Sequence, residues 1–354
     1  MRNDEQGLGD DSSTKVLRRK VLICVESLAY NRGGIASIGR IMARTYSKAG
    51  WNVTVLTHNV DGKFNFENVR IVVNPSKLEI FREFFCSEYV ISVGDLLRLV
   101  WPLLLIKRKA IIVKHGSVNA KSSIHRFVEQ LLAKRVVWGG VSQFVVDHDN
   151  VKGGKVVPNA RDPEIFFTDG SVKKYDLLFV GGMTEEKGIF TLADAMEVLK
   201  NRGVSVNKLT MVGEGKDFSR FMKYVGSRLP KGCAFEMTGN LDALGVADQM
   251  RKHRCVIVPS MNIVWQEAFP LVPIEAQSCG CQVIVSESGG LPESGGPCAQ
   301  VFPCGDYQKL ACCIENVLLG RHVIDPVKVK AHLDMYTPQN MMEVYNRLVD
   351  ERFA

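Results

Sequence analysis

The chain has 354 residues, of which 46% are hydrophobic and 23% charged, so it is long enough for two domains that each bury a core. This composition excludes a disordered or fibrous protein, and no run of about 18 apolar residues predicts a transmembrane helix. The net charge of +7 is uneven, because residues 1–170 carry 25 Lys and Arg against 17 Asp and Glu. A basic half suggests an anionic partner, and a chance distribution over a solvated surface explains it equally well.

The first half of the chain alternates short β-branched runs with helical patterns. Residues 1–20 are polar and mixed in charge, so we expect a frayed tail and no signal peptide there. Predicted strands cover residues 20–27, 51–58, 69–75, 89–95, 110–116 and 135–142, and predicted helices cover 35–50 and 122–135. Strand–helix alternation of this kind predicts a parallel sheet with helices on both faces.

A second series of the same kind begins after the polar stretch at 168–175. Its predicted strands are 176–182, 208–215, 234–240, 255–260 and 281–287, and its predicted helices are 187–201, 217–228, 244–252, 272–280 and 306–319. The sequence therefore predicts an α/β protein with two Rossmann-like domains facing a cleft, residues 1–168 and 169–337. We expect the last helix, within 338–354, to pack back on the first domain. Ligands of such open sheets bind outside the carboxyl ends of the strands.

The ten cysteines do not predict a metal site. No C-x2-C pair occurs and no histidine follows at zinc-finger spacing, so zinc is not expected. Cys24 and Cys255 lie in apolar runs, where cysteine behaves as a small hydrophobe. Reduced thiols and a cytoplasmic location are the simplest interpretation.

Candidate ligand-binding residues of the first half follow its strands. Gly33 and Gly34 open a helix, where backbone N–H groups can meet an anion, or they form a plain tight turn. His58, not an acid, ends the second strand, so a dinucleotide fingerprint is weak. His115 ends another apolar strand, where it can act as a general base, bind a hydroxyl, or serve only the structure.

The second half repeats the strand–glycine–helix pattern. Gly181 and Gly182 end its first strand, and Gly213 ends the next. Lys187 lies at the start of the following helix, where it opposes the helix dipole. A bound phosphate would explain that position, and an exposed lysine without a ligand is the alternative.

Two glutamates stand in a proline-containing segment of the second half. Glu267 is predicted on a loop, because Pro270 and Pro273 keep the chain irregular until a helix begins near residue 273. Glu275 falls in the first turn of that helix. A carboxylate there can accept two hydrogen bonds from a sugar diol, or it can simply stabilise the helix N-terminus.

These fragments, in this order, resemble the retaining group-1 glycosyltransferases of family 4, whose fold is GT-B. The resemblance is carried by Gly33-Gly34, His115-Gly116, VVPNARDPEIF at 156–166, VGGMTEEKG at 180–188, MVGEG at 211–215, the stretch from Pro259 to Gly280, and SGGLPE at 288–293. It covers most of the chain. Each fragment alone is weak, whereas their order on the predicted strand–helix plan is specific.

The resemblance implies a role for each matching residue. Glu275 would bind the nucleotide ribose, Glu267 would contact the donor sugar, and Lys187 would neutralise the diphosphate as it leaves. His115 would orient the acceptor rather than act as an essential base. The remaining donor-binding residues implied are Gly33, Gly34, Gly181, Gly182, Gly213, Phe269, Leu271 and Val272, and Asn159 and Arg161 belong to the matching interdomain segment.

Three positions depart from the family pattern. Gly182 stands where an arginine commonly pairs with the diphosphate, so Lys187, with Arg161, would have to supply the charge. Ala160 replaces the usual glycine of the interdomain segment. Pro270 stands where glycine is frequent and removes one N–H donor.

The resemblance implies transfer of a hexosyl unit from a nucleotide-diphosphate sugar, with UDP as a guess, to a glycan or lipid-linked acceptor in cell-surface polysaccharide or lipopolysaccharide biosynthesis. It implies no cofactor, no metal and no nucleic acid. A nucleotide-sugar epimerase and a non-catalytic sugar-nucleotide binding protein are the alternatives. Residues 95–110 join an apolar run to Lys107, Arg108 and Lys109, which suits peripheral contact with an anionic membrane at its inner face, or a core helix with a solvated end.

Overall fold

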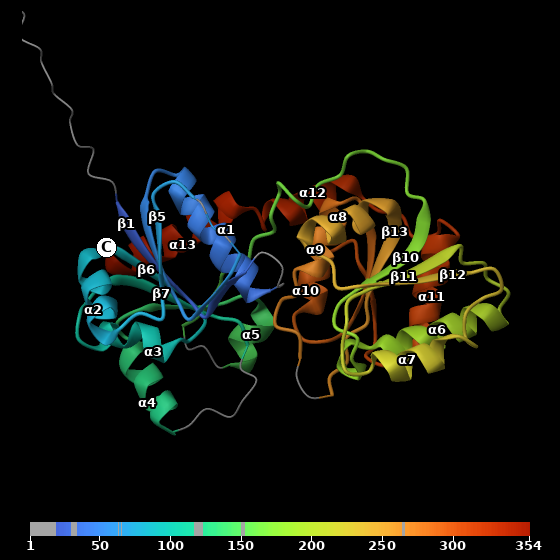
Figure 1. The fold of residues 1–354 in the computed structure, drawn as a ribbon, viewed down its shortest axis with the longest axis horizontal. Helices are drawn as coiled ribbons and strands as arrows, with labels where there is room; N and C mark the ends of the chain where they lie inside the picture. The colour runs from blue at the N-terminus through green and yellow to red at the C-terminus, as the bar shows by residue number, and fades with distance from the viewer. Residues whose placement is uncertain are drawn as a thin grey trace, which may run out of the picture.

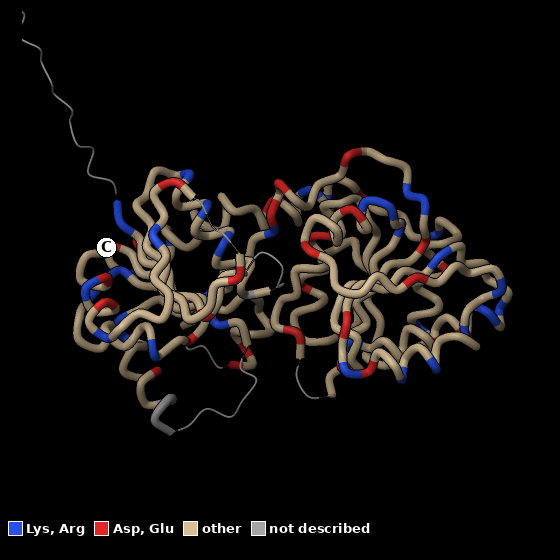
Figure 2. Tube along the Cα trace, in the orientation of Figure 1, with Lys and Arg blue, Asp and Glu red and all other residues tan. Residues whose placement is uncertain are grey.

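The computed structural model describes residues 19–29, 34–62, 64, 66–116, 123–149, 153–263 and 266–354. Two sheets of parallel strands, each with helices against it, lie side by side (Figure 1). The predicted ligand-binding residue Gly33 lies outside the described residues. Lys and Arg are spread over both parts of the molecule beside Asp and Glu (Figure 2).

The first sheet has the strand order β5-β3-β1-β6-β7-β8-β9. Its strands are β1 (Lys20–Val25), β3 (Asn52–Thr57), β5 (Val69–Val73), β6 (Tyr89–Val93), β7 (Lys109–Lys114), β8 (Val137–Gly140) and β9 (Lys155–Val156), and β2 (Ser27–Ala29) pairs with β4 (Asn59–Asp61). The order reverses between β1 and β6, and such a reversal is where open α/β sheets bind ligands. Its helices are α1 (Ile35–Lys48), α2 (Lys77–Cys86), α3 (Leu97–Val100), α4 (Ser123–Leu132) and α5 (Gln143–His148), with a 3-10 turn η1 (Trp101–Leu104).

The second sheet has the order β12-β11-β10-β13-β14-β15 and reverses between β10 and β13. Its strands are β10 (Tyr175–Val180), β11 (Lys208–Val212), β12 (Ala234–Gly239), β13 (His253–Val258), β14 (Gln282–Ser286) and β15 (Gln300–Phe302). Its helices are α6 (Ile189–Asn201), α7 (Phe218–Val225), α8 (Ala243–Lys252), α9 (Val272–Ser278), α10 (Leu291–Gly295) and α11 (Tyr307–Leu318), with a 3-10 turn η2 (Glu185–Lys187). The predicted architecture of two Rossmann-like units is confirmed, since both sheets have the same winding.

The chain returns from the second sheet to the first through α12 (Pro326–Asp334) and α13 (Pro338–Phe353). Met341, Tyr345 and Val349 of α13 are buried in the hydrophobic core of the first sheet. The hydroxyl of Tyr46 on α1 also donates to Asn346 Oδ1 at 2.7 Å. The C-terminus therefore lies with the first sheet (Figure 1), as the sequence pattern predicts.

For residues 95–110 the membrane-facing interpretation is wrong at Leu99, Val100 and Leu103, because these side chains lie in the core. Leu99, Val100 and Leu103 are at most 1% exposed and pack under the first sheet. Leu105, by contrast, is 68% exposed. The alternative of a core segment with a solvated basic end describes the structure, because these side chains complete the face of the sheet that α1 and α13 do not cover.

Candidate active site between the two sheets

A cavity of about 370 Å³ lies at the carboxyl ends of β10, β11 and β13 and is closed by α1 from the first sheet. Its lining residues are Ser37, Arg40, Ile41, Asp162, Phe166, Phe179, Val180, Gly181, Gly182, Lys187, Val212, Gly213, Asn240, Leu241, Ala243, Val246, Val258, Ser260, Glu267, Pro270, Val272 and Glu275. The cavity opens where the strand order of the second sheet reverses, which is where open α/β sheets bind ligands.

Lys187 and Glu267 form an ion pair at the cavity wall. Lys187 Nζ lies 2.7 Å from Glu267 Oε1, and the Ser260 hydroxyl donates to the same oxygen at 2.8 Å. The lysine is placed by a tight turn: Gly188 has φ +74°, and a Cβ there would lie 1.8 Å from the carbonyl oxygen of Pro259. Glu267 is only 7% exposed, so these two contacts satisfy a carboxylate oxygen that is largely shielded from water.

Glu275 lies in the first turn of α9, as predicted, and lines the same cavity. Pro273 is near the start of this helix, where its fixed φ suits helix initiation. Burial raises the pKa of the Glu275 carboxyl to about 8, and the negative charge of Asp162 adds to the rise. The carboxyl is therefore largely protonated at neutral pH.

Two glycines that line the cavity differ in whether their position requires glycine. Gly213 has φ +131°, and a Cβ there would lie 2.0 Å from the carbonyl oxygen of Gly181, so only glycine fits. A Cβ on Gly182 would have the Glu214 carbonyl oxygen and Thr184 Cγ2 as its nearest neighbours, each 3.9 Å away. Gly182 thus leaves room for a side chain that the backbone would tolerate.

His115 follows β7 and lies on the first-sheet side of the molecule. Burial lowers its pKa to about 4, against the opposing charge of Asp95, so the ring is neutral at neutral pH. Its Nε2 is buried and has no hydrogen-bond partner among the described residues. The next residue, Gly116, approaches the loop after Glu267, since a Cβ on Gly116 would lie 3.2 Å from Ala268 Cβ.

Direct bonds join the two sheets around this loop. The Glu293 carboxylate accepts from the backbone N–H groups of Gln143 at 2.7 Å and Phe144 at 2.9 Å. The Ser142 hydroxyl donates to the carbonyl oxygen of Ala268 at 2.7 Å. The segment SGGLPE therefore holds the start of α5 against the Glu267 loop.

The structure brings together part of the predicted site. The predicted residues that line the cavity are Gly181, Gly182, Lys187, Gly213, Glu267, Val272 and Glu275. Phe269 and Leu271 instead point into the core of the first sheet, where Phe269 packs on Tyr336. Gly34 precedes α1 and has φ +73°, and it is not among the residues that line the cavity.

Asn159 and Arg161, the two predicted residues of the interdomain segment, do not line the cavity. Asn159 is buried, and its Oδ1 has no partner among the described residues. Arg161 donates from Nη1 to the carbonyl oxygen of Phe166 at 3.4 Å, and its backbone N–H donates to the carbonyl oxygen of Tyr336. Arg161 therefore bonds within the interdomain segment and to the segment between α12 and α13.

The sequence pattern does not reveal that α1 and the linker between the two sheets contribute residues to the cavity wall. Ser37, Arg40 and Ile41 come from one face of α1, and Asp162 and Phe166 come from the segment between the sheets. The spacing along α1 is a signal that could have predicted a shared face. Nothing in the local sequence shows that this face closes a cavity of the second sheet.

Residues 161–329 match the family model described as glycosyl transferases group 1. The fold is similar to that of sucrose-phosphate synthase from Thermosynechococcus elongatus, with 16% identity, a TM-score of 0.69, and coverage of 95% of this chain and 99% of that one. The lipopolysaccharide outer core galactosyltransferase WaaB matches with 15% identity, a TM-score of 0.68, and 94% and 99% coverage.

Anabaena HepE, solved in complex with UDP, matches with 15% identity, a TM-score of 0.67, and coverage of 94% of this chain and 100% of HepE. No curated protein matches the chain in sequence. At these identities the solved structures establish the fold alone, which is the two-domain GT-B arrangement.

Proposed function

From the match of residues 161–329 to the family model of group 1 glycosyltransferases, we propose that the protein is a retaining glycosyltransferase. It moves a hexosyl unit from a nucleotide-diphosphate sugar to a glycan or lipid-linked acceptor, in the biosynthesis of a cell-surface polysaccharide. The observation that carries this proposal is the cavity, whose walls hold a carboxyl suited to a diol, a lysine and a buried carboxylate.

The donor side follows from the cavity chemistry. Glu275 faces the cavity and can bond both hydroxyls of a ribose. The glycine turns after β10 and β11 let a diphosphate approach the backbone, and Lys187 provides positive charge beside them. The UDP complex of HepE supports a uridine donor for this chain.

The transfer step needs little covalent chemistry from the protein. The bond between the sugar C1 and the diphosphate oxygen breaks, and a bond forms between C1 and the acceptor oxygen on the same face. The acceptor proton passes to the leaving phosphate oxygen. Lys187 stabilises the charge on that oxygen, Glu267 lies at the donor sugar, and neutral His115 accepts a hydrogen bond that orients the acceptor.

Donor turnover is the direct test. Purified protein is incubated with UDP-, GDP- and ADP-hexoses and a lipid-linked acceptor extract, with and without EDTA, and nucleoside diphosphate release is followed. A retained anomeric configuration in the product, seen by NMR, and full activity in EDTA are expected. Release of an epimerised nucleotide sugar would support the epimerase. Tight donor binding without any product would support a non-catalytic sugar-nucleotide binding protein and contradict the proposed transferase activity.

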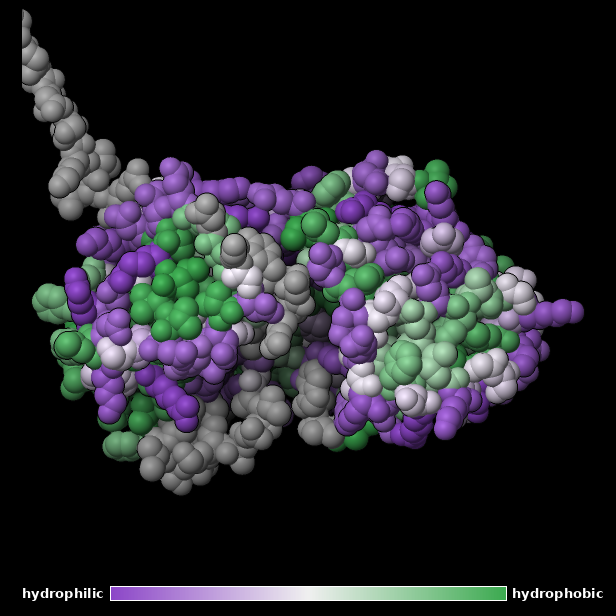
Figure 3. Space-filling view, in the orientation of Figure 1, coloured by the Kyte–Doolittle hydropathy of each residue, from purple (hydrophilic) through white to green (hydrophobic). Residues whose placement is uncertain are grey.

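An anionic membrane surface is the acceptor-side part of the proposal. No helix in the described part of the chain is both long and apolar enough to cross a bilayer. On α2, Leu78 is 78% and Phe85 66% exposed, and the Arg108 guanidinium lies 5.5 Å from the Phe85 ring centre. Figure 3 shows hydrophobic residues among hydrophilic ones along the edge that carries α2. Apolar and cationic groups together suit an anionic headgroup layer at the inner face of the plasma membrane.

The double variant Leu78→Ser/Phe85→Ser is expected to lose most binding to phosphatidylglycerol vesicles at low salt, measured by co-sedimentation. The same change at Phe218 and Met222 of α7, which are also exposed, is the matched control and should leave binding unchanged. Equal binding of the wild type to phosphatidylcholine vesicles, or no binding at low salt, would remove the membrane from the proposal.

A further inference from the structure

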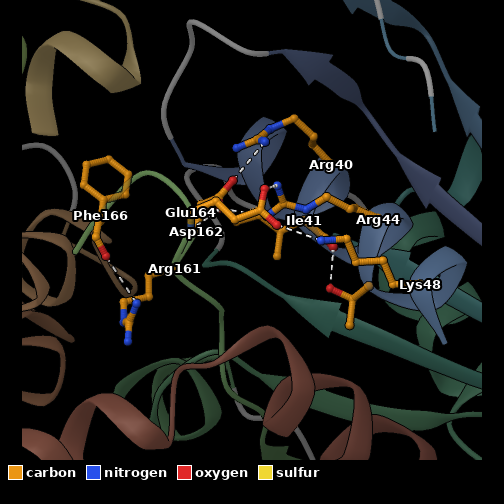
Figure 4. Close-up of polar contacts among 9 residues, drawn as sticks. Arg40, Ile41, Arg44, Lys48, Arg161, Asp162, Glu164 and Phe166 are labelled. Atoms are coloured by element: carbon orange, nitrogen blue, oxygen red, sulfur yellow. Dashed lines mark hydrogen bonds and ion pairs between the residues drawn. The ribbon is translucent and has the colours of Figure 1, made fainter.

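Three basic residues of α1 face the linker between the two sheets (Figure 4). Arg40 Nη1 lies 3.0 Å from Asp162 Oδ2, and Arg44 Nη2 lies 2.7 Å from Asp162 Oδ1. Arg44 and Lys48 also pair with Glu164, each at 2.7 Å. Arg40, Arg44 and Lys48 recur every four residues, so they form one stripe on the helix.

Asp162 keeps a cationic partner whether or not Arg40 remains beside it. Its side chain is 2% exposed, which opposes ionisation, yet the hydrogen bond from Arg44 and the charges of Arg44 and Arg40 hold its pKa below the usual value. Arg44 contacts it at the shorter distance. If the Arg40 guanidinium moves, the buried carboxylate is therefore still paired.

Arg40 differs from Arg44 and Lys48 because it also lines the cavity. It is only 4% exposed, and it stands across from the glycine turns of the second sheet. Among the lining residues the cations are Arg40 and Lys187, and each is paired with a carboxylate, Asp162 or Glu267. A diphosphate adds at least two negative charges to a cavity whose fixed charges are balanced.

We propose that Arg40 is a donor-binding residue of the first domain, whose guanidinium turns from Asp162 to the diphosphate of the bound nucleotide while Arg44 keeps Asp162 paired. This inference rests on the proposed function. A guanidinium is suited to the role because it bonds two phosphate oxygens at once. The donor then bridges the two domains, with its nucleotide on the second sheet and its phosphates held from α1.

The test compares ligands that differ only in phosphate. Binding of UDP and uridine is measured by calorimetry and ligand-observed NMR on wild type, Arg40→Ala and Arg44→Ala, with GDP and guanosine in parallel. Arg40→Ala should weaken diphosphate binding about tenfold or more and leave nucleoside binding unchanged. Arg40→Lys should recover part of the loss. If the wild type binds no nucleotide, the proposed function itself is refuted. This outcome is distinct from a failure of the Arg40 proposal, in which the wild type binds UDP and Arg40→Ala binds it equally well.

Arg44→Ala is the matched control, since it removes an ion pair from the same carboxylate but does not line the cavity. It should lower the melting temperature and keep the UDP-to-uridine affinity ratio of wild type. An equal loss of UDP and uridine binding in Arg40→Ala, or the same ratio in both variants, would overturn the proposal, because Arg40 would then act through the fold.

A second experiment supplies the positive charge from the opposite wall of the cavity. Gly182 lines the cavity and leaves space for a side chain, so Gly182→Arg places a new guanidinium there. In the Arg40→Ala background this change should restore UDP affinity toward that of wild type. If Gly182→Arg strengthens UDP binding in the wild type but restores nothing in Arg40→Ala, the role of Arg40 is not its charge, and the proposal fails.

Discussion

Replacing Glu275 by Gln should weaken nucleotide binding about tenfold or more and, at the same time, make the protein more stable above neutral pH. The loss of binding follows because an amide has one oxygen that can accept a hydrogen bond from the ribose diol, where the carboxyl group has two. The gain in stability follows because burial and Asp162 oppose a negative charge at this position. The residue therefore costs stability in the free protein and contributes to ligand binding.

The sign of the pH effect follows from proton binding. The carboxyl has a pKa of about 8 in the folded protein, against an ordinary value of 4.5. Between these values the folded protein holds a proton that the unfolded chain releases, so the wild-type free energy of unfolding falls as pH rises. Glu275→Gln lacks this loss. Its advantage should grow from about pH 5, reach roughly a few kcal/mol, and level off above about pH 8.

Urea unfolding at pH 5, 7 and 9 measures this difference, and UDP titration at the same pH values measures binding. Glu287→Gln changes an exposed glutamate of the same domain, so it should alter neither. A stability difference between wild type and Glu275→Gln that does not change with pH would contradict the raised pKa. Unchanged UDP affinity would show that Glu275 does not bind the nucleotide.

Lys187→Ala should reduce the turnover number about 100-fold or more, while the affinity for uridine stays near that of wild type. The lysine is expected to stabilise charge that develops on the leaving diphosphate, which is a transition-state effect. Glu267, however, is buried and pairs with Lys187 at 2.7 Å. Removing the lysine leaves that carboxylate with a neutral donor, the Ser260 hydroxyl, in place of a cation, so stability should fall as well.

Two variants separate chemistry from folding. Lys187→Met/Glu267→Gln removes both charges and should regain much of the lost stability without regaining turnover. Lys216→Ala removes an exposed lysine that pairs with Glu186 of the turn η2, and should change neither property. Kinetics of transfer and thermal unfolding give the two readouts. If the double variant turns over donor at the wild-type rate, Lys187 has no role in the chemistry.

The local pattern is sufficient to predict most of the elements. Most strands of the two sheets and helix α13 lie where the hydrophobic periodicity predicts them, within a few residues at each end, whereas strands β9 and β15 are absent from the prediction. Helices α2, α3, α5, α10 and α12 are absent from the prediction, although α2 has a complete capping box at Ser76 and Glu79. That signal is readable in the sequence, since the spacing of serine and glutamate is the signature of a helix start.

The predicted site residues that line the cavity all belong to the second half of the chain, and Gly34 and His115, predicted on the first half, do not line it. Glycine turns at strand ends and the paired glutamates are local features, so the second-sheet wall of the cavity can be assigned from the sequence. The first-sheet wall cannot, because Arg40 and Asp162 are 122 positions apart and meet through the packing of α1 on the linker. For the same reason the local sequence does not show that the side chains of Phe269 and Leu271 belong to the core of the first sheet.

Local sequence was enough to establish the two series of strands and helices, the unequal charge of the halves, and the residues available at the strand ends, because periodicity and turn chemistry act over a few neighbouring residues. Properties that depend on what surrounds each group came instead from the packing of the whole chain. Burial raises the pKa of Glu275 and lowers that of His115, and it removes Leu99, Val100 and Leu103 from the surface. Packing, not sequence separation, also put Arg40 at the cavity wall beside Asp162.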